Sequence, residues 1–460
     1  MDSTSSQRGP TSRLAHWAAA VPRERTLAAR VEAQRGIKDL VGCLIGGAIE
    51  RVPKIVAKVA TSTSGQGLCT IVGQTQKVPA QAAAYANGTA AHILDFDDSF
   101  RPLTGHPSCT IVPAILAVAE ERGSSGDDVL DAYVVGIEIA ACLGRAAPKH
   151  HDCGWHGTAT VGVISSAAAC ARLMKLDAAG ITNAISMAFS ASSGGRVQIG
   201  YDIKSMQPGA AARDAVVAAT MAAAGIVGCS EVLTGPWGWS KVYSNVNGDG
   251  SEYTMPDLAA GEPLAIQDPG ITFKPYPTCG STHRTLNAVL ELVNKYDIRA
   301  DDVESIETTI PFLNTANLRY LCPANGMQGR FCMSYTCALA VLYRQILLSD
   351  FEDDAVQRPE VQAFMPKVTM NTLPGSEHTD KTYLEMPCHT RIKLRSGTFY
   401  DDTRYDRRGE ASDPLTGREE QDKFYDCTSK VMSTRQADQV MKLLDNMSEV
   451  SCIKSLMDLL

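Results

Sequence analysis

The stretch of the sequence richest in candidate catalytic groups is residues 92–108, HILDFDDSFRPLTGHPS, which lies between two apolar runs. A DFDD run begins at Asp95, and Ser99 and His106 follow it. A His can take up or release a proton near neutral pH, and a carboxylate beside it can orient the ring. Asp is also common in turns, so a solvated or turn-forming role for these acids stays open. We predict that this stretch delivers Asp95 and His106 to one wall of an active site.

Three further basic residues lie near the predicted starts of later helices. His156 precedes GTATVG, Lys204 lies just before Pro208, and Lys274 precedes TCGSTHRTLNAVLELV. A helix N-terminus attracts anions and disfavours a charged imidazole. Converging helix starts would therefore form a pocket for a multiply charged anion such as a polycarboxylate, with a neutral His as the base. Taken singly, a His or Lys before a helix is more often an ordinary loop residue.

The sequence contains no pattern typical of a metal or nucleotide site. Its 14 cysteines are scattered, and the closest pair is Cys332 and Cys337, so no CxxC motif is present. This spacing excludes a zinc ribbon and argues against an iron–sulfur cluster. No glycine-rich phosphate loop or dinucleotide-binding fingerprint occurs. Unpaired cysteines in apolar runs are typical of a reducing compartment.

Composition narrows the partners and the location of the protein. The net charge of −8 gives no electrostatic reason to expect nucleic acid binding. No apolar run reaches the roughly 18 residues of a membrane span. The first residues lack the long apolar segment of a secretion signal but are rich in Ser and Arg. We therefore expect a cytoplasmic protein with a disordered tail over residues 1–25, and a mitochondrial location is the alternative.

The elements that must position these residues are mainly helices. From about residue 26 to residue 235, Ala-rich runs such as AYVVGIEIAACLGRA and TATVGVISSAAACARLMKL predict long helices. Several are apolar on all sides, which is typical of buried helices. We predict a mainly α protein in which residues 1–267 form a large helical domain.

The pattern changes near residue 265, at the connection PLAIQDPGITFKPYPTCGS. Beyond it, HRTLNAVLELVNKYD and CALAVLYRQILL predict helices, whereas VESIETTIP, KVTMNTL and HTRIKLRSG alternate as strands do. We predict a smaller α+β domain over residues 268–400. The helical pattern resumes after it, so residues 401–460 are expected to return to the helical domain.

The same stretches resemble the MmgE/PrpD family, in the family's order and from about residue 30 onward. The resemblance runs through AAYANGTAAHILDFDDSF, GHPSCTIVPAILAVAE, GWHGTATVG, DIKSMQPGAAARDAVVAA, FKPYPTCGSTH and GRFCMSYTCALA. The family includes 2-methylcitrate dehydratase, cis-aconitate decarboxylase and iminodisuccinate epimerase. The resemblance implies a helical domain built from both chain ends, an inserted α+β lid domain, a homodimer, and no metal or organic cofactor.

The resemblance also implies a set of site residues. The implied catalytic residues are Asp95, His106, His156, Lys204, Lys274 and Tyr335, and the substrate-binding residues are Ser99, Gln207 and Cys279. By itself Tyr335 would be interpreted as a core aromatic. Two positions depart from many relatives, because Gln207 stands where many members have a His and Cys279 stands where some decarboxylases have one.

Together, the residues and the resemblance predict a lyase that moves a proton at a carbon next to a carboxylate. Lysines and helix N-termini would stabilise the negative charge that develops there. The lead hypothesis is dehydration of 2-methylcitrate or a related alkylcitrate. Decarboxylation of a cis-aconitate-like acid is the first alternative, and epimerisation of a polycarboxylate is the second. A binding or scaffold protein on the same fold is the alternative from another class.

Overall fold

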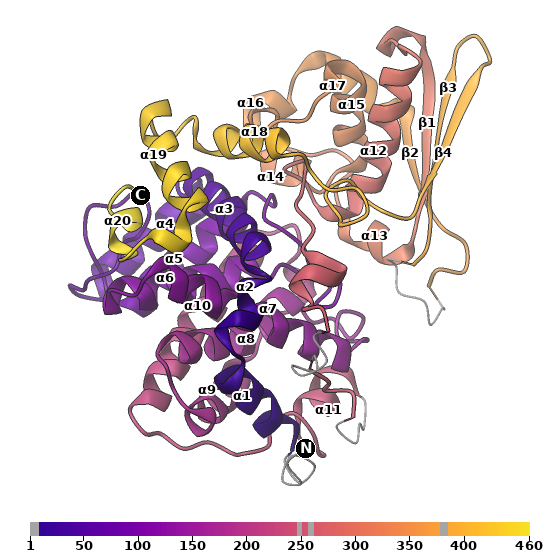
Figure 1. Cartoon of the computed structure of the whole chain (residues 1–460). Helices are drawn as coiled ribbons and strands as arrows, with labels where there is room; N and C mark the ends of the chain where they lie inside the picture. The colour runs from indigo at the N-terminus through magenta and orange to yellow at the C-terminus, as the bar shows by residue number, and fades with distance from the viewer. Residues whose placement is uncertain (1–8, 246–250, 256–261, 378–384) are drawn as a thin grey trace.

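The computed structural model describes residues 9–245, 251–255, 262–377 and 385–460. A helical domain forms one end of the molecule and a smaller α+β domain forms the other (Figure 1). The helices of the first domain's N-terminal part are α1 (Pro10–Ala20), α2 (Arg23–Leu27), α3 (Arg30–Gly47), α4 (Arg51–Thr63), α5 (Ala80–Ile93), α6 (Ser108–Arg122), α7 (Gly126–Ala146), α8 (Gly157–Leu173), α9 (Ala178–Ala191), α10 (Asp202–Ala223) and α11 (Trp239–Ser244). None of the described helices is long and apolar enough to cross a membrane.

The prediction of a disordered tail over residues 1–25 is wrong for the part that the structure describes. Residues 10–20 form α1, which packs on α9 and buries Leu14 and Trp17. The guanidinium of Arg172 donates to the backbone oxygens of Ala18, Ala19 and Val21, so it satisfies the carbonyl groups at the end of α1. Residues 1–8 lie outside the described part of the chain.

Small residues let the central helices approach each other closely. A Cβ added at Gly88 on α5 would lie 2.8 Å from Cα of Gly209 on α10. A Cβ at Gly209 would lie 2.4 Å from the backbone oxygen of Tyr85. Because these contacts admit no side chain, α5 and α10 touch backbone to backbone. The contact brings the start of α10, which carries Lys204, beside the end of α5 and the DFDD loop.

The α+β domain contains one mixed four-stranded sheet. Its strands are β1 (Val303–Ile310), β2 (Val368–Thr372), β3 (Cys388–Leu394) and β4 (Phe399–Arg404), in the order β2-β1-β3-β4. The β1–β2 pair is parallel and the other two pairs are antiparallel. The predicted domain end at residue 400 falls inside β4, so the sheet extends to Arg404. The domain's helices are α12 (Gly280–Lys295), α13 (Phe312–Asn317), α14 (Gly326–Gly329), α15 (Met333–Tyr343), α16 (Asp353–Val356) and α17 (Pro359–Phe364).

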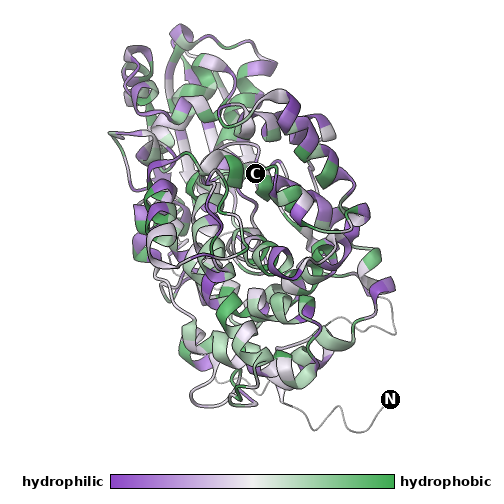
Figure 2. Ribbon diagram, turned by 90° about the vertical axis from the view of Figure 1, so that its left-hand side faces the viewer, coloured by the Kyte–Doolittle hydropathy of each residue, from purple (hydrophilic) through white to green (hydrophobic). Residues whose placement is uncertain are grey.

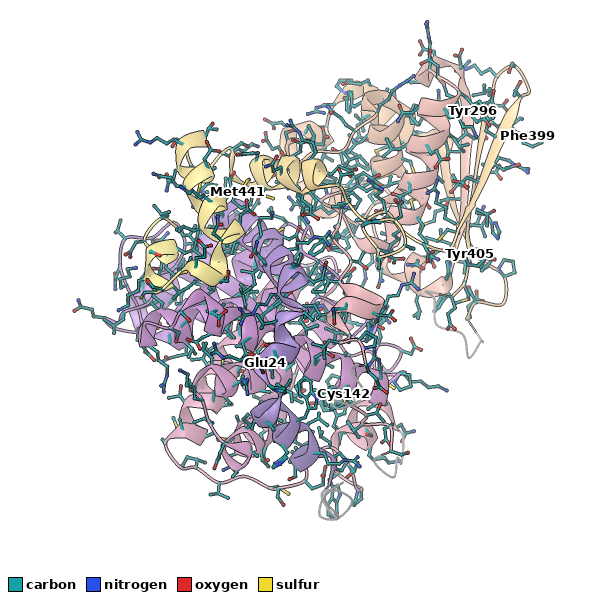
Figure 3. The ribbon with its side chains drawn as sticks, viewed as in Figure 1. Glu24, Cys142, Tyr296, Phe399, Tyr405 and Met441 are labelled. Atoms are coloured by element: carbon teal, nitrogen blue, oxygen red, sulfur yellow. The ribbon has the colours of Figure 1, made fainter. Side chains whose placement is uncertain are left out.

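Helices cover one face of this sheet and leave the other open. In Figure 1, α12 and α15 lie on the same side of the strands. The open face carries cross-strand ion pairs such as Arg391 with Asp401 and Lys393 with Glu304. At one end of the sheet, where Figure 3 labels Tyr296 and Phe399, Tyr296 stacks on Tyr400 with ring centroids 4.0 Å apart. The alternating pattern of the strands therefore reflects one packed face and one solvated face.

The C-terminal helices pack against the helical domain. They are α18 (Gly417–Thr428), α19 (Thr434–Asp445) and α20 (Lys454–Met457), and both α18 and α19 contact α3. Their Phe424, Val440 and Leu444 belong to the same apolar core as α3, whereas the α+β domain has a separate core. Purple and green alternate along the outer helices in Figure 2, as expected for helices with one buried face.

Candidate active site

The basic residues near the predicted helix starts line one pocket, together with groups from the α+β domain. His106, His156, Lys204 and Lys274 all contribute to its surface. The other predicted residues in its lining are Asp95, Ser99 and Cys279. The pocket is also lined by residues that the sequence did not single out, including Arg101, His151, Thr158, Ser281, Asn317, Phe331 and Arg407.

The centre of the pocket is a buried carboxylate held between two lysines. Asp95 Oδ2 lies 2.9 Å from Lys204 Nζ, and Oδ1 lies 2.5 Å from Lys274 Nζ. Burial would raise the pKa of the Asp95 carboxyl, but the two ammonium groups together hold it well below its usual range. The ionised Asp97 nearby offsets the second lysine, but the pocket lining as a whole has four cations, Arg101, Lys204, Lys274 and Arg407, so it can attract a further carboxylate.

The loop that carries Asp95 is held in place by its backbone. Asp95 has a φ of +51°, a left-handed conformation that Asp tolerates better than most residues. Lys274 Nζ also donates to the backbone oxygen of Asp95, at 2.8 Å. Ser99 and Thr272 exchange two backbone hydrogen bonds of 2.9 and 2.8 Å. The segment that carries Lys274 is therefore fastened to the DFDD loop at two points.

The relation of these residues to helix starts differs in part from the prediction. His156 is the N-cap of α8, and His106 lies two residues before α6, as expected. Lys204 lies inside the first turn of α10, because this helix begins at Asp202 and continues through Pro208. Lys274 lies six residues ahead of α12 and reaches the pocket from an extended segment. Packing, and not a helix end, places Lys274 on Asp95.

Gln207 determines which ring nitrogen of His156 carries the proton. Gln207 Nε2 donates to the backbone oxygen of Gly195 at 3.2 Å, so its Oε1 is the atom 2.6 Å from His156 Nδ1. An amide oxygen only accepts hydrogen bonds, so Nδ1–H donates and Nε2 of the neutral ring is left to accept a proton. Burial, reinforced by His92 and Lys204, lowers the pKa of His156 to about 3. His156 is therefore a neutral base in this structure.

His106 has the same arrangement. Its Nδ1 lies 2.5 Å from the backbone oxygen of Asp98, so Nδ1 carries the hydrogen and Nε2 can accept a proton. Burial holds the pKa of His106 well below its usual value, Asp97 opposes this shift, and Lys274 adds to it. The carbonyl of Asp98 thus performs for His106 the orienting function that the sequence assigned to Asp95. Asp95 itself pairs with the lysines.

His92 was not among the predicted site residues, although its ring lies near both predicted histidines. Its ring centroid is 4.8 Å from that of His106 and 5.9 Å from that of His156. His92 Nδ1 lies 2.7 Å from Asp97 Oδ2, and its Nε2 has no hydrogen-bond partner among the described residues. The five-residue spacing from His92 to Asp97, across the end of α5, was the only local signal for this pair.

The remaining acids of the DFDD run are buried and not solvated. Asp97 and Asp98 have no exposed surface. Asp98 bonds to the hydroxyl of Ser108, which in turn lies 2.5 Å from the Tyr133 hydroxyl. Burial raises the pKa of the Asp98 carboxyl to about 8. These two acids therefore belong to the internal support of the loop.

One group of side chains in the described part of the chain could hold a metal ion. The candidate ligand atoms of His92, Asp97 and His106 all lie within 4.8 Å of one another. In this arrangement, however, both ring Nδ1 atoms take part in hydrogen bonds, one to Asp97 and the other to the Asp98 carbonyl. A metal ion bound through these nitrogens would have to displace both hydrogen bonds.

The structure does not bring Tyr335 to the pocket. Tyr335 is fully buried in the core of the α+β domain and donates its hydroxyl proton to the backbone oxygen of Asp350. Its ring packs edge-on against Phe351. The interpretation as a core aromatic agrees with this environment, whereas the catalytic role implied by the resemblance has no geometric support. Cys279, by contrast, is in the pocket lining, and burial raises the pKa of its thiol.

Comparison with known proteins agrees with this architecture. The MmgE/PrpD N-terminal domain matches residues 12–250, and the MmgE/PrpD C-terminal domain matches residues 276–447. The chain is 26% identical over 429 residues to a human protein named cis-aconitate decarboxylase, an alignment that covers 91% of this chain and 87% of the human one. It is 28% identical over 383 residues to a protein of the same name from Aspergillus terreus, with 78% of each chain covered. The two domain matches span most of the sequence, and the chain belongs to the MmgE/PrpD family.

Proposed function

We propose that the protein is a cofactor-independent carboxy-lyase that acts on an unsaturated tricarboxylate resembling cis-aconitate. The observation that carries the proposal is the Asp95–Lys204–Lys274 cluster, which places excess positive charge beside the neutral bases His106 and His156. The names of the human and fungal relatives favour decarboxylation over dehydration. This order reverses the preference for an alkylcitrate dehydratase that we expected from the sequence.

The chemistry requires an electron sink and one proton. In cis-aconitate, the carboxylate on the CH2 group leaves as CO2, the electrons of the broken bond form a new double bond between the CH2 carbon and the central carbon, and the electrons of the old double bond move to the vinyl carbon. Negative charge then develops on the former vinyl carbon, next to a carboxylate that remains. A proton added at that carbon yields methylenesuccinate. No redox step occurs, so the atoms and electrons balance with one proton taken up and one CO2 released.

Residues of the pocket can meet both requirements. Lys204 and Lys274 supply fixed positive charge where the dienolate forms, and such preorganised charge is usually a large part of catalysis. His106 or His156 supplies the proton through its Nε2. A bound trianion offsets the charges of the lysines, so it raises the pKa of a histidine that burial and the lysines depress in the empty pocket. Substrate binding would thereby convert a neutral histidine into the acid that the reaction needs.

The proposal is tested by product analysis. The purified protein is incubated separately with cis-aconitate, 2-methylcitrate and iminodisuccinate, and the products are followed by proton NMR, CO2 release and optical rotation. We expect CO2 and methylenesuccinate, in equal amounts, from cis-aconitate. A new alkene from 2-methylcitrate without CO2 would instead support the dehydratase, loss of optical rotation alone would support the epimerase, and no turnover would support a binding protein.

The absence of a metal requirement is tested separately. Prolonged treatment with a strong chelator should leave kcat unchanged, because the proposed chemistry uses only the lysines and histidines of the pocket. Stoichiometric iron or zinc that leaves together with activity would overturn this part of the proposal and would identify the His92–Asp97–His106 group as the site.

We also propose a homodimer, which sedimentation analysis would test.

A further inference from the structure

One wall of the pocket is built by a segment that the mechanism above does not use. Residues 405–413 connect β4 to the C-terminal helices, and we call them the strap. Tyr405, at its start, lies at the end of the sheet toward the helical domain (Figure 3). Phe273 N donates to the backbone oxygen of Gly409 at 3.0 Å, so the strap is tied to the segment that carries Lys274. From this position the strap inserts Arg407 into the pocket lining.

The guanidinium of Arg407 is oriented and has one amino group directed at the start of α12. Its Nε donates to Glu410 Oε1 at 3.0 Å, and Nη2 lies 3.4 Å from Ser99 Oγ. Burial would raise the pKa of Glu410, but Arg407 and Arg101 hold it below its usual value, so Glu410 is an ionised anchor. A Cβ added at Gly280 would lie 2.9 Å from Arg407 Nη1. Gly280 therefore leaves the room that this amino group occupies.

A second donor beside Arg407 is the hydroxyl of Ser281, which also lines the pocket and is 6% exposed. Ser281 Oγ accepts hydrogen bonds from the side-chain amides of Asn314 and Asn317, at 3.0 and 3.2 Å. Arg284 and Arg196 donate to the oxygens of these amides, which fixes their nitrogens toward Ser281. A hydroxyl that accepts twice keeps its proton for a third partner. No acceptor for this proton is found among the described residues.

We propose that Arg407 Nη1, the Ser281 hydroxyl and the first backbone N–H of α12 form a subsite for a second carboxylate of the substrate. This inference rests on the proposed function and extends it. Lys204 and Lys274 would hold the carboxylate next to the reacting carbons, whereas the strap and α12 would hold a carboxylate at the other end of the molecule. The subsite selects tricarboxylates over shorter acids, because a ligand without the distal carboxylate leaves these donors unpaired.

The test measures binding of tricarballylate, the saturated analogue of cis-aconitate, by calorimetry to the full-length protein. R407Q should weaken tricarballylate binding by about 30-fold or more, the scale of a lost charge-assisted hydrogen bond in a buried site. Succinate, which the lysine pair can hold alone, should lose less than about threefold in affinity. The matched control is R408Q, because the neighbouring Arg408 pairs with Asp413 and Glu419 and does not line the pocket.

A second variant tests the subsite without removing a charge. In G280A the new methyl group would displace Arg407 Nη1, and we expect the same selective loss for tricarballylate. If R407Q does not fold, tricarballylate binding to G280A alone decides whether the subsite exists. The inference is overturned if both variants bind tricarballylate within twofold of the wild type, or if R408Q weakens binding as much as R407Q does.

The wild type separates the two proposals. If it binds tricarballylate and releases CO2 from cis-aconitate while R407Q keeps normal selectivity, only the subsite is wrong. If the wild type neither binds tricarballylate nor releases CO2, the proposed function fails and the subsite fails with it.

Discussion

Two buried ion clusters hold neighbouring carbonyl groups of the same loop, and they differ in charge balance and in the size of the pocket that they line. Lys274 donates to the backbone oxygen of Asp95, and Lys423 of α18 donates to that of Phe96, at 2.7 Å. Lys423 also pairs with Asp39 of α3 at 2.6 Å. Both clusters thus combine a carboxylate, an ammonium group and a backbone carbonyl in a buried site.

The second cluster is electrically balanced and lines a smaller pocket. Asp39 and Lys423 pair one to one, and the Lys423 ammonium lies 4.3 Å from the centroid of the Phe96 ring. Burial would lower the pKa of Lys423, but Asp39 more than compensates and raises it. The Asp95 cluster has two lysines for one carboxylate, and all three line the pocket. Burial of an ion pair is therefore weak evidence for function, whereas excess charge that faces a pocket indicates an anion site.

The largest expected effect comes from neutralising the carboxylate of the first cluster. D95N should lower kcat/KM by about 10³-fold, because Lys204 and Lys274 lose the group that positions them. The variant should also be less stable, since two buried ammonium groups then repel each other. Steady-state kinetics and urea unfolding check both results. A D95N enzyme with near-normal turnover would contradict the distinction between the two clusters.

Breaking the second cluster should mainly affect stability. K423M leaves Asp39 buried without a partner and should lower the free energy of unfolding by about 3–5 kcal/mol. Its kcat should stay within about tenfold of the wild type, because Lys423 only supports the loop. The double variant D39N/K423M should recover part of the lost stability, as measured by urea unfolding. A larger loss in kcat than in D95N would place Lys423 in the catalytic machinery instead.

Removing a histidine of the pocket should affect turnover more than stability. H106Q should lower kcat by about 10²-fold or more if His106 supplies or accepts the proton. A residue that merely supports the start of α6 would cost about 1 kcal/mol of stability and leave kcat nearly intact. Measuring kcat and the Tm of the one variant separates these outcomes, and K423M serves as the opposite control.

The pH dependence of stability should also distinguish the two regions, because His106 and His156 lie beside the Asp95 cluster. His156 has a folded pKa of about 3 against about 6.5 when unfolded, so the unfolded state binds more protons between these values. Stability is therefore fully present above pH 6.5 and falls as the pH is lowered toward 3. At pH 5 this histidine alone should cost about 2 kcal/mol relative to pH 7. Urea unfolding at several pH values gives the free energy of unfolding as a function of pH, and this free energy should fall more steeply below pH 6.5 in the wild type than in H156Q. Parallel pH curves for the two proteins would contradict the assignment to His156.

The smallest effect is expected at Tyr335, which belongs to neither cluster. Y335F removes one buried hydrogen bond to the Asp350 carbonyl and should cost about 1 kcal/mol of stability. Activity should remain within twofold of the wild type. A kcat loss comparable with that of H106Q would restore the catalytic role that the family resemblance implied.

Much of the fold could be predicted from local patterns. Apolar periodicity located the long helices and three of the four strands, since each pattern reflects burial within a few consecutive residues. The sequence patterns also predicted the order of the segments along the chain: helical, then α+β, then helical again. The tail prediction failed because α1 is short and was not recognised as a helix, although Leu14, Trp17 and Ala18 have the i, i+3, i+4 spacing of the face that α1 buries against the helical domain.

For the site, the residue types and some helix starts could be read from the sequence alone. His106 and His156 precede α6 and α8 because Pro107 and Gly157 mark the ends of the preceding loops. The tertiary structure alone decided which groups meet. Ser99 and Arg407 are 308 residues apart, and His156 reaches Gln207 across 51 residues. Local sequence reports backbone preference and burial over a few residues, whereas the charge balance of a pocket depends on contacts between distant segments, which only packing creates.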